Sequence, residues 1–146
     1  MANEVYEKSK KFLKQYPKTI AWRVKKHSNV IQEHMNENEL VLYAFAGQKN
    51  ASFTAPFYTN VIVFTNKRML MGTKRFLGRY NFISITPDML NDFSIRNNIL
   101  FGEVEIDTVK ENFTIKCLDK RALPKIEDAI SKYMIEEKIK LLKNKK

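Results

Sequence analysis

A run of short apolar segments between residues 60 and 118 constrains the fold of this chain more than any other feature. Turn-forming residues separate the segments, and several segments alternate apolar with polar side chains, which is typical of half-buried β-strands. A stretch with helical spacing follows directly, and its apolar positions are Leu123, Ile126, Ile130, Tyr133 and Met134. With an apolar run at residues 40–46, the pattern predicts seven strands and one helix at residues 123–134. We therefore expect a mainly β, α+β fold, a small seven-stranded barrel closed by its C-terminal helix.

Two amphipathic segments precede the strands and predict an N-terminal pair of helices. The first covers residues 4–16. The second begins at Thr19, a residue type that often caps helices, and its stripe consists of Ile20, Val24, His27, Ile31 and Met35. We expect three parts in the chain: a helical extension at 1–37, the barrel with its helix at 38–137, and a lysine-rich tail at 138–146.

The composition is that of one globular domain. The chain has 146 residues, of which 44% are hydrophobic and 12% aromatic, enough for one sizeable core and too few for two. The net charge of +10 comes mainly from lysines on the predicted helices, where such charge usually keeps a protein soluble. The first residues lack a leader pattern, and no apolar run approaches the roughly 20 residues of a membrane span. We expect a cytoplasmic protein.

No set of residues has the spacing of a catalytic or metal site. His27 and His34 are the two histidines, and a zinc motif of the H-x-x-E-H type would need a histidine where Val30 stands. The single cysteine, Cys117, excludes an intramolecular disulfide, and its alternation with apolar neighbours predicts a buried, unreactive thiol. We expect no enzymatic activity, no cofactor and no metal.

The segment at residues 67–79 combines basic and apolar side chains. It contains no acidic residue and five basic ones, Lys67, Arg68, Lys74, Arg75 and Arg79. Phe76 and Leu77 lie between them and Tyr80 follows. Such a segment can bind anionic lipid or nucleic acid by charge, with insertion or stacking of its apolar residues. The interpretation that we favour is simpler, namely that the charges protect a sheet edge from pairing with other chains.

Three aromatic residues, Phe53, Phe57 and Tyr58, surround Pro56 in the loop after the first strand. Aromatic side chains in such a loop either fold back on the barrel or form a contact patch for another protein. The N-terminal helices of the same chain could also cover the patch. The sequence leaves these alternatives open.

Three elements resemble those of bacterial PH domains, specifically the YokE-like branch: NELVLYA at 38–44, FTNKRMLMG at 64–72, and residues 76–85 followed by ILFGEVEI at 99–106. The resemblance implies a PH-like barrel that serves as a binding or assembly module and has no known catalytic activity. Phosphoinositide-binding PH domains use a basic loop between the first two strands. Here that loop, 47–56, contains one lysine and no arginine, so we expect no specific phosphoinositide site.

These observations predict a non-enzymatic module that mediates protein–protein interaction, with assembly into a homo-oligomer as one form. The alternative function is peripheral binding of anionic membrane surfaces or nucleic acid through residues 67–79. Added salt distinguishes the two functions, because charge-driven binding weakens steeply with ionic strength and an apolar interface does not.

Overall fold

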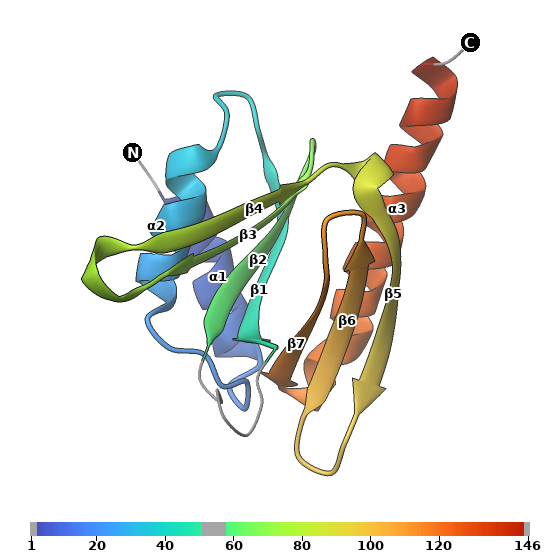
Figure 1. The fold of residues 1–146 in the computed structure, drawn as a ribbon. Coiled ribbons are helices and arrows are strands. Elements are labelled where there is room, and N and C mark those ends of the chain that lie inside the picture. The colour runs from blue at the N-terminus through green and yellow to red at the C-terminus, as the bar shows by residue number, and fades with distance from the viewer. Residues whose placement is uncertain (1–2, 51–57, 145–146) are drawn as a thin grey trace.

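The computed structural model describes residues 3–50 and 58–144 and shows an antiparallel sheet with helices on both sides (Figure 1). The described helices are α1 (Glu4–Gln15), α2 (Val24–His34) and α3 (Leu123–Asn144). The described strands are β1 (Val41–Lys49), β2 (Thr59–Thr65), β3 (Met69–Lys74), β4 (Tyr80–Ile85), β5 (Leu90–Asn97), β6 (Gly102–Thr108) and β7 (Asn112–Leu118). Short 3-10 turns lie at Phe76–Gly78, Pro87–Met89 and Lys120–Ala122.

The strands follow the order β4-β3-β2-β1-β7-β6-β5, and β1 belongs to both halves of the sheet. It pairs with β2 along most of its length but with β7 only through Gln48 and Lys49. The two halves therefore diverge from this junction and enclose a space between them, and α3 packs beside β5, β6 and β7 (Figure 1). The predicted fold, a PH-like arrangement of seven strands with a C-terminal helix and N-terminal helices, is confirmed.

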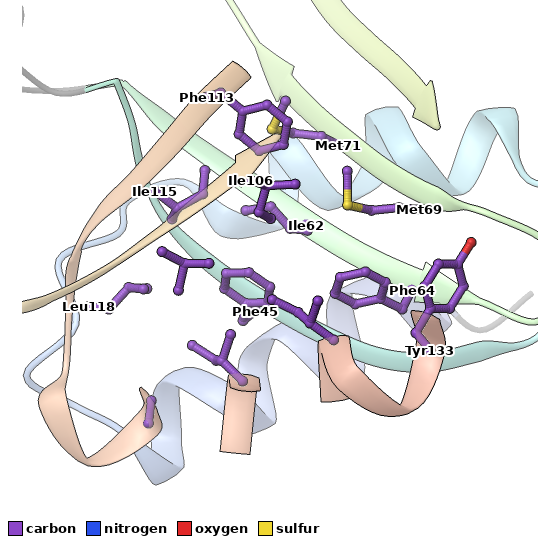
Figure 2. Close-up of a cluster of buried hydrophobic side chains, with 14 of the residues drawn as sticks. Phe45, Ile62, Phe64, Met69, Met71, Ile106, Phe113, Ile115, Leu118 and Tyr133 are labelled. Atoms are coloured by element: carbon purple, nitrogen blue, oxygen red, sulfur yellow. The ribbon is translucent and has the colours of Figure 1, made fainter. Parts of the chain in front are cut away.

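The main core lies between the two halves of the sheet and α3 (Figure 2). Phe45, Ile62 and Phe64 point into it from β1 and β2, and Ile106 and Ile115 from β6 and β7, all of them buried. From α3 the predicted stripe contributes Leu123, Ile126, Ile130 and Tyr133, with Met134 packed against its margin. The apolar spacing of this helix therefore identified its buried face correctly.

A second core lies on the opposite face of β1, β2 and β3, under α1 and α2. It contains Val5 of α1, Ile31 of α2, and Ala44, Val63 and Leu70 of the strands. Because these three strands are covered on both faces, they consist of continuous apolar runs without polar alternation. The N-terminal helices are thus packed against the sheet as a third layer.

The second helix begins later than its apolar stripe predicts. It starts at Val24, and Thr19 does not cap it. The Thr19 hydroxyl instead accepts a hydrogen bond of 2.9 Å from the backbone N–H of Asp119, and the N–H of Ile20 donates to the Cys117 carbonyl at 2.9 Å. The segment before α2 is therefore held by the end of β7, and Arg23 makes the entry to the helix in a left-handed conformation with φ 53°.

Two expectations about the C-terminal part are wrong. The first expectation is that Cys117 faces inward. The pairing of β7 with β6 shifts register between Gly102 and Val104 of β6, and Cys117 of β7 adopts a positive φ of 62°. This bulge leaves Cys117 half-buried and turns Leu118 into the core instead. In addition, α3 continues to Asn144, well beyond residue 134 where the predicted helix ends.

Candidate functional site

The five basic residues of segment 67–79 form two groups at opposite ends of β3 (Figure 1). Lys67 and Arg68 lie in the turn between β2 and β3, which the Thr65 N–H closes by donating to the Arg68 carbonyl at 2.9 Å. Lys74, Arg75 and Arg79 lie at the other turn, between β3 and β4. Since β3 has six residues, roughly 20 Å separate the two groups. The segment therefore does not form a single basic surface.

Arg68 is engaged inside the protein and does not face a ligand. Its guanidinium donates to both carboxylate oxygens of Glu39, at 2.9 and 3.0 Å, and to the Ser84 hydroxyl and the His34 carbonyl. Burial alone would raise the pKa of Glu39, but the hydrogen bonds from Arg68, Thr65 and the Asn36 backbone outweigh burial and lower this pKa. Arg68 thus joins the end of α2 to the strands, and anion binding by Arg68 stays a prediction.

The turn between β3 and β4 exposes two large apolar side chains. Phe76 is 83% exposed and Leu77 is 81% exposed, and Leu77 has a positive φ of 59°. The Arg75 N–H donates to the Arg79 carbonyl at 2.6 Å and closes the turn below them. We call residues 74–80 the β3–β4 tip. It presents an apolar pair at its end with basic residues on either side.

A cleft of about 560 Å³ separates the β3–β4 tip from α2. Its positively charged lining residues are Arg23 and Lys26 from the start of α2 and Lys74 and Arg75 from the tip, and its single carboxylate is that of Glu33. Phe76, Leu77, Gly78 and Tyr80 complete the wall on the tip side. We call this space the α2 cleft. Four positive charges against one negative charge give the cleft a net positive lining.

His27 lies at the base of the α2 cleft and joins α2 to the tip. Its Nδ1 accepts a hydrogen bond of 2.8 Å from the backbone N–H of Lys74, so this nitrogen carries no proton. Burial lowers the pKa of His27 to about 4; a hydrogen bond with the Trp22 backbone opposes this shift, and the charges of Arg23 and Lys26 add to it. His27 is therefore neutral at pH 7 and has a structural role.

Tyr58 holds Arg75 in place. The Arg75 guanidinium lies over the Tyr58 ring at 4.5 Å from its centroid and donates a hydrogen bond to the Tyr58 hydroxyl. Asn81 donates to the same hydroxyl at 2.8 Å. Tyr58, expected in a patch for a protein partner, thus supports the basic side of the tip. Phe53 and Phe57, the other two residues of that expected patch, lie outside the described residues.

A family model described as bacterial PH domain matches residues 35–132, more than half of the chain. This chain belongs to the bacterial PH domain family. The assignment to the YokE-like branch remains a prediction from the sequence motifs. The match begins after α2, so this bacterial PH domain protein builds one wall of the α2 cleft from residues outside the matched region.

Two solved structures are similar to this bacterial PH domain protein. One is a pleckstrin homology domain from Shewanella amazonensis SB2B, with 16% identity, a TM-score of 0.48, and coverage of 73% of this chain and 84% of that chain. The other is a DUF1696 family protein with a pleckstrin-homology domain from Shewanella loihica PV-4, with 16% identity, a TM-score of 0.47, and coverage of 73% and 92% respectively. Among curated proteins, none matches this chain.

Sequence reasoning missed two residues of the site, Arg23 and Lys26. The excess positive charge of the predicted helices was interpreted as charge that keeps the protein soluble, and only the packing of α2 against β3 brings Arg23 and Lys26 beside Lys74 and Arg75. Within the described residues, no group of histidine, cysteine, aspartate and glutamate side chains is arranged to hold a metal ion. None of the described helices combines the length and apolarity needed to cross a membrane.

Proposed function

We propose that this bacterial PH domain protein is a non-catalytic binding module that docks on anionic membrane surfaces through the β3–β4 tip. The observation that carries the proposal is the Phe76–Leu77 pair, more than four-fifths exposed at the end of a turn with Lys74, Arg75 and Arg79 around it. Apolar side chains can enter the acyl boundary of a bilayer while basic side chains remain at the anionic headgroups.

The magnitudes are adequate for reversible docking. Transfer of Phe76 and Leu77 out of water contributes about 1.5–3 kcal/mol each. Each basic residue close to an anionic surface contributes about 1 kcal/mol, and Arg23 and Lys26 border the same face as the tip. Together these terms reach about 8–11 kcal/mol, against the roughly 8 kcal/mol of a micromolar dissociation constant, before the cost of immobilising the protein. The docking would be reversible and sensitive to salt.

The geometry supports membrane docking better than it supports the two other interpretations of the basic segment, edge protection and nucleic-acid binding. Charges that guard a sheet edge lie along the edge strand, whereas Lys74, Arg75 and Arg79 gather at the end of β3 and β4. Single-stranded nucleic acid binds to exposed ring faces on which bases stack. Phe76 and Tyr80 offer such rings, but Leu77, which is as exposed as Phe76, does not. An aliphatic residue beside an aromatic one at a projecting turn fits insertion among acyl chains.

A second candidate function, protein–protein interaction including self-association, is favoured by a different surface. On the C-terminal part of α3, Ile135, Ile139 and Leu142 are exposed at a spacing of four and three residues, which is the spacing of a coiled-coil seam. Light scattering after size separation, at low and high salt, tests this function. A mass that stays monomeric at all protein concentrations would exclude self-association.

Vesicle co-sedimentation tests membrane docking with a matched pair of variants. Phe76→Ser/Leu77→Ser removes the apolar pair of the tip. Ile99→Ser/Leu100→Ser removes an equally exposed apolar pair from the turn between β5 and β6, on another side of the molecule (Figure 1). If the tip inserts, the first variant weakens binding to anionic vesicles by about 100-fold or more. A 100-fold change is two tenfold steps and corresponds to about 2.8 kcal/mol of binding free energy.

The control variant should bind as the wild type does. Wild-type binding should also fall steeply when salt increases from about 0.05 M to about 0.5 M. Wild-type protein that fails to bind anionic vesicles at the lower salt contradicts the proposal. Equal losses in the two variants would show that general surface apolarity, and not the tip, drives the association.

A further inference from the structure

We propose that the α2 cleft binds the phosphomonoester headgroup of an anionic lipid while the β3–β4 tip is docked on the membrane. This inference rests on the proposed function and adds a ligand class to it. The cleft has room for such a group, because its volume of about 560 Å³ lies within the range of small-molecule sites, roughly 300–1,000 Å³.

The positive charges of the cleft converge from two elements. Arg23 and Lys26 come from the start of α2, and Lys74 and Arg75 come from the end of β3. None of the four forms a salt bridge with another described residue. Their charges are therefore not neutralised within the described protein and remain available to a ligand.

The negative charge in the cleft lies away from Arg23 and Lys26. Glu33 follows Lys26 by seven positions on α2, which places it roughly 10 Å further along the helix axis. His27 adds no positive charge at pH 7, since its Nδ1 accepts the Lys74 N–H. The end of the cleft at Arg23 thus has a strong preference for anions, with Lys26, Lys74 and Arg75 close to it.

A phosphomonoester matches this arrangement better than a phosphodiester does. A terminal phosphate carries a charge of about −1.5 to −2 near neutral pH and offers three acceptor oxygens, so several basic side chains can bind it at once. The planar guanidinium groups of Arg23 and Arg75 can each donate two parallel hydrogen bonds to such a group. Tyr58 stabilises the orientation of the Arg75 guanidinium by stacking.

The position of the cleft favours a phosphate that is attached to a lipid. Phe76 and Leu77 line the cleft and also form the exposed end of the tip. A lipid whose chains lie beside this inserted pair would hold its headgroup at the mouth of the cleft. The headgroup site and the insertion site are therefore parts of one continuous surface.

The test compares vesicles that contain phosphatidylserine with vesicles that contain phosphatidic acid, at equal zeta potential. We expect wild-type protein to bind the phosphatidic acid vesicles at least about tenfold more tightly, one tenfold step being about 1.4 kcal/mol. Arg23→Gln/Lys26→Gln should lose this selectivity, and its binding to phosphatidylserine should weaken by no more than about 30-fold, the effect of two surface charges of about 1 kcal/mol each. Phe76→Ser/Leu77→Ser should lose binding to both kinds of vesicle.

Lys138→Gln/Lys143→Gln is the matched charge control, since both lysines are exposed on α3, on the far side from the tip (Figure 1). This variant should keep the selectivity, and unchanged urea midpoints should show that both charge variants are folded. Equal wild-type binding at equal zeta potential overturns the headgroup site and leaves membrane docking intact. Absence of binding to either vesicle overturns both proposals. Binding of soluble glycerol phosphate without vesicle binding would overturn the lipid source of the phosphate.

Discussion

Replacement of Arg68 by alanine should destabilise the protein strongly and leave its membrane binding unchanged. The side chain of Glu39 is 0% exposed, and Arg68 supplies hydrogen bonds to both of its carboxylate oxygens. Without Arg68, a buried carboxylate keeps only neutral donors, the Thr65 hydroxyl at 2.6 Å and the Asn36 N–H at 3.1 Å. Removal of one partner from a buried ion pair costs about 3–5 kcal/mol, a large part of the roughly 5–15 kcal/mol that stabilises a domain.

Urea unfolding followed by circular dichroism measures this loss. Glu39→Met/Arg68→Met is the informative comparison, because replacing both members of a buried ion pair with apolar residues is often close to neutral. The double variant should therefore be more stable than Arg68→Ala. A loss below about 1 kcal/mol for Arg68→Ala would refute the reasoning, because it would show that Glu39 does not depend on this partner.

The dependence on pH gives a second test of the same pair. The folded pKa of Glu39 is lowered, so this group stabilises the wild type above its ordinary pKa of 4.5, and the contribution is lost as pH falls through the folded pKa. In Arg68→Ala, the buried carboxylate of Glu39 has lost its positive partner, so protonation of Glu39 stabilises the folded variant. The deficit of the variant should therefore shrink as pH decreases toward about 4.5. A deficit that is the same at neutral and acid pH would contradict this account.

Three further predictions concern individual residues. Because the pKa of His27 falls from 6.5 to about 4 on folding, the wild type should lose up to about 3 kcal/mol as pH decreases through this window. His27→Asn keeps an acceptor but cannot titrate, so its urea stability should vary less; an unchanged slope would contradict the assignment. Ile126→Ala should cost about 2–5 kcal/mol, and a change below about 0.5 kcal/mol would exclude α3 from the core. Burial raises the pKa of the Cys117 thiol, so a thiol reagent should label folded protein more slowly than unfolded protein, and equal rates would show an accessible thiol.

The strands and α3 were predictable because their signals are local. The apolar spacing of Ile126 and Ile130 identifies one helix face without knowledge of the rest of the molecule. The start of α2 was not predictable in this way, since the Thr19 hydroxyl bonds to the backbone of Asp119, one hundred positions away. The bulge at Cys117 likewise depends on the register that β7 adopts against β6.

The candidate site was only partly predictable. Lys74, Arg75 and Arg79 form the basic side of the tip, as their proximity in the sequence suggests. Arg68 was assigned to the same group because it is close to Lys74 and Arg75 in the sequence. In the folded chain the length of β3 separates it from them. Its partner Glu39 lies 29 positions earlier, so the ion pair becomes visible only in the folded chain.

Fluorescence of a tryptophan at the tip tests the central claim most directly. In Trp22→Phe/Phe76→Trp, the single tryptophan of the chain is moved to the β3–β4 tip, and Trp22→Phe/Ile99→Trp moves it to the turn between β5 and β6. With anionic vesicles that contain brominated lipid, the tip tryptophan should shift to shorter wavelength and be quenched, and the other should not change. If the protein is bound to vesicles and the tip tryptophan still has the emission wavelength that it has in water, the tip does not insert.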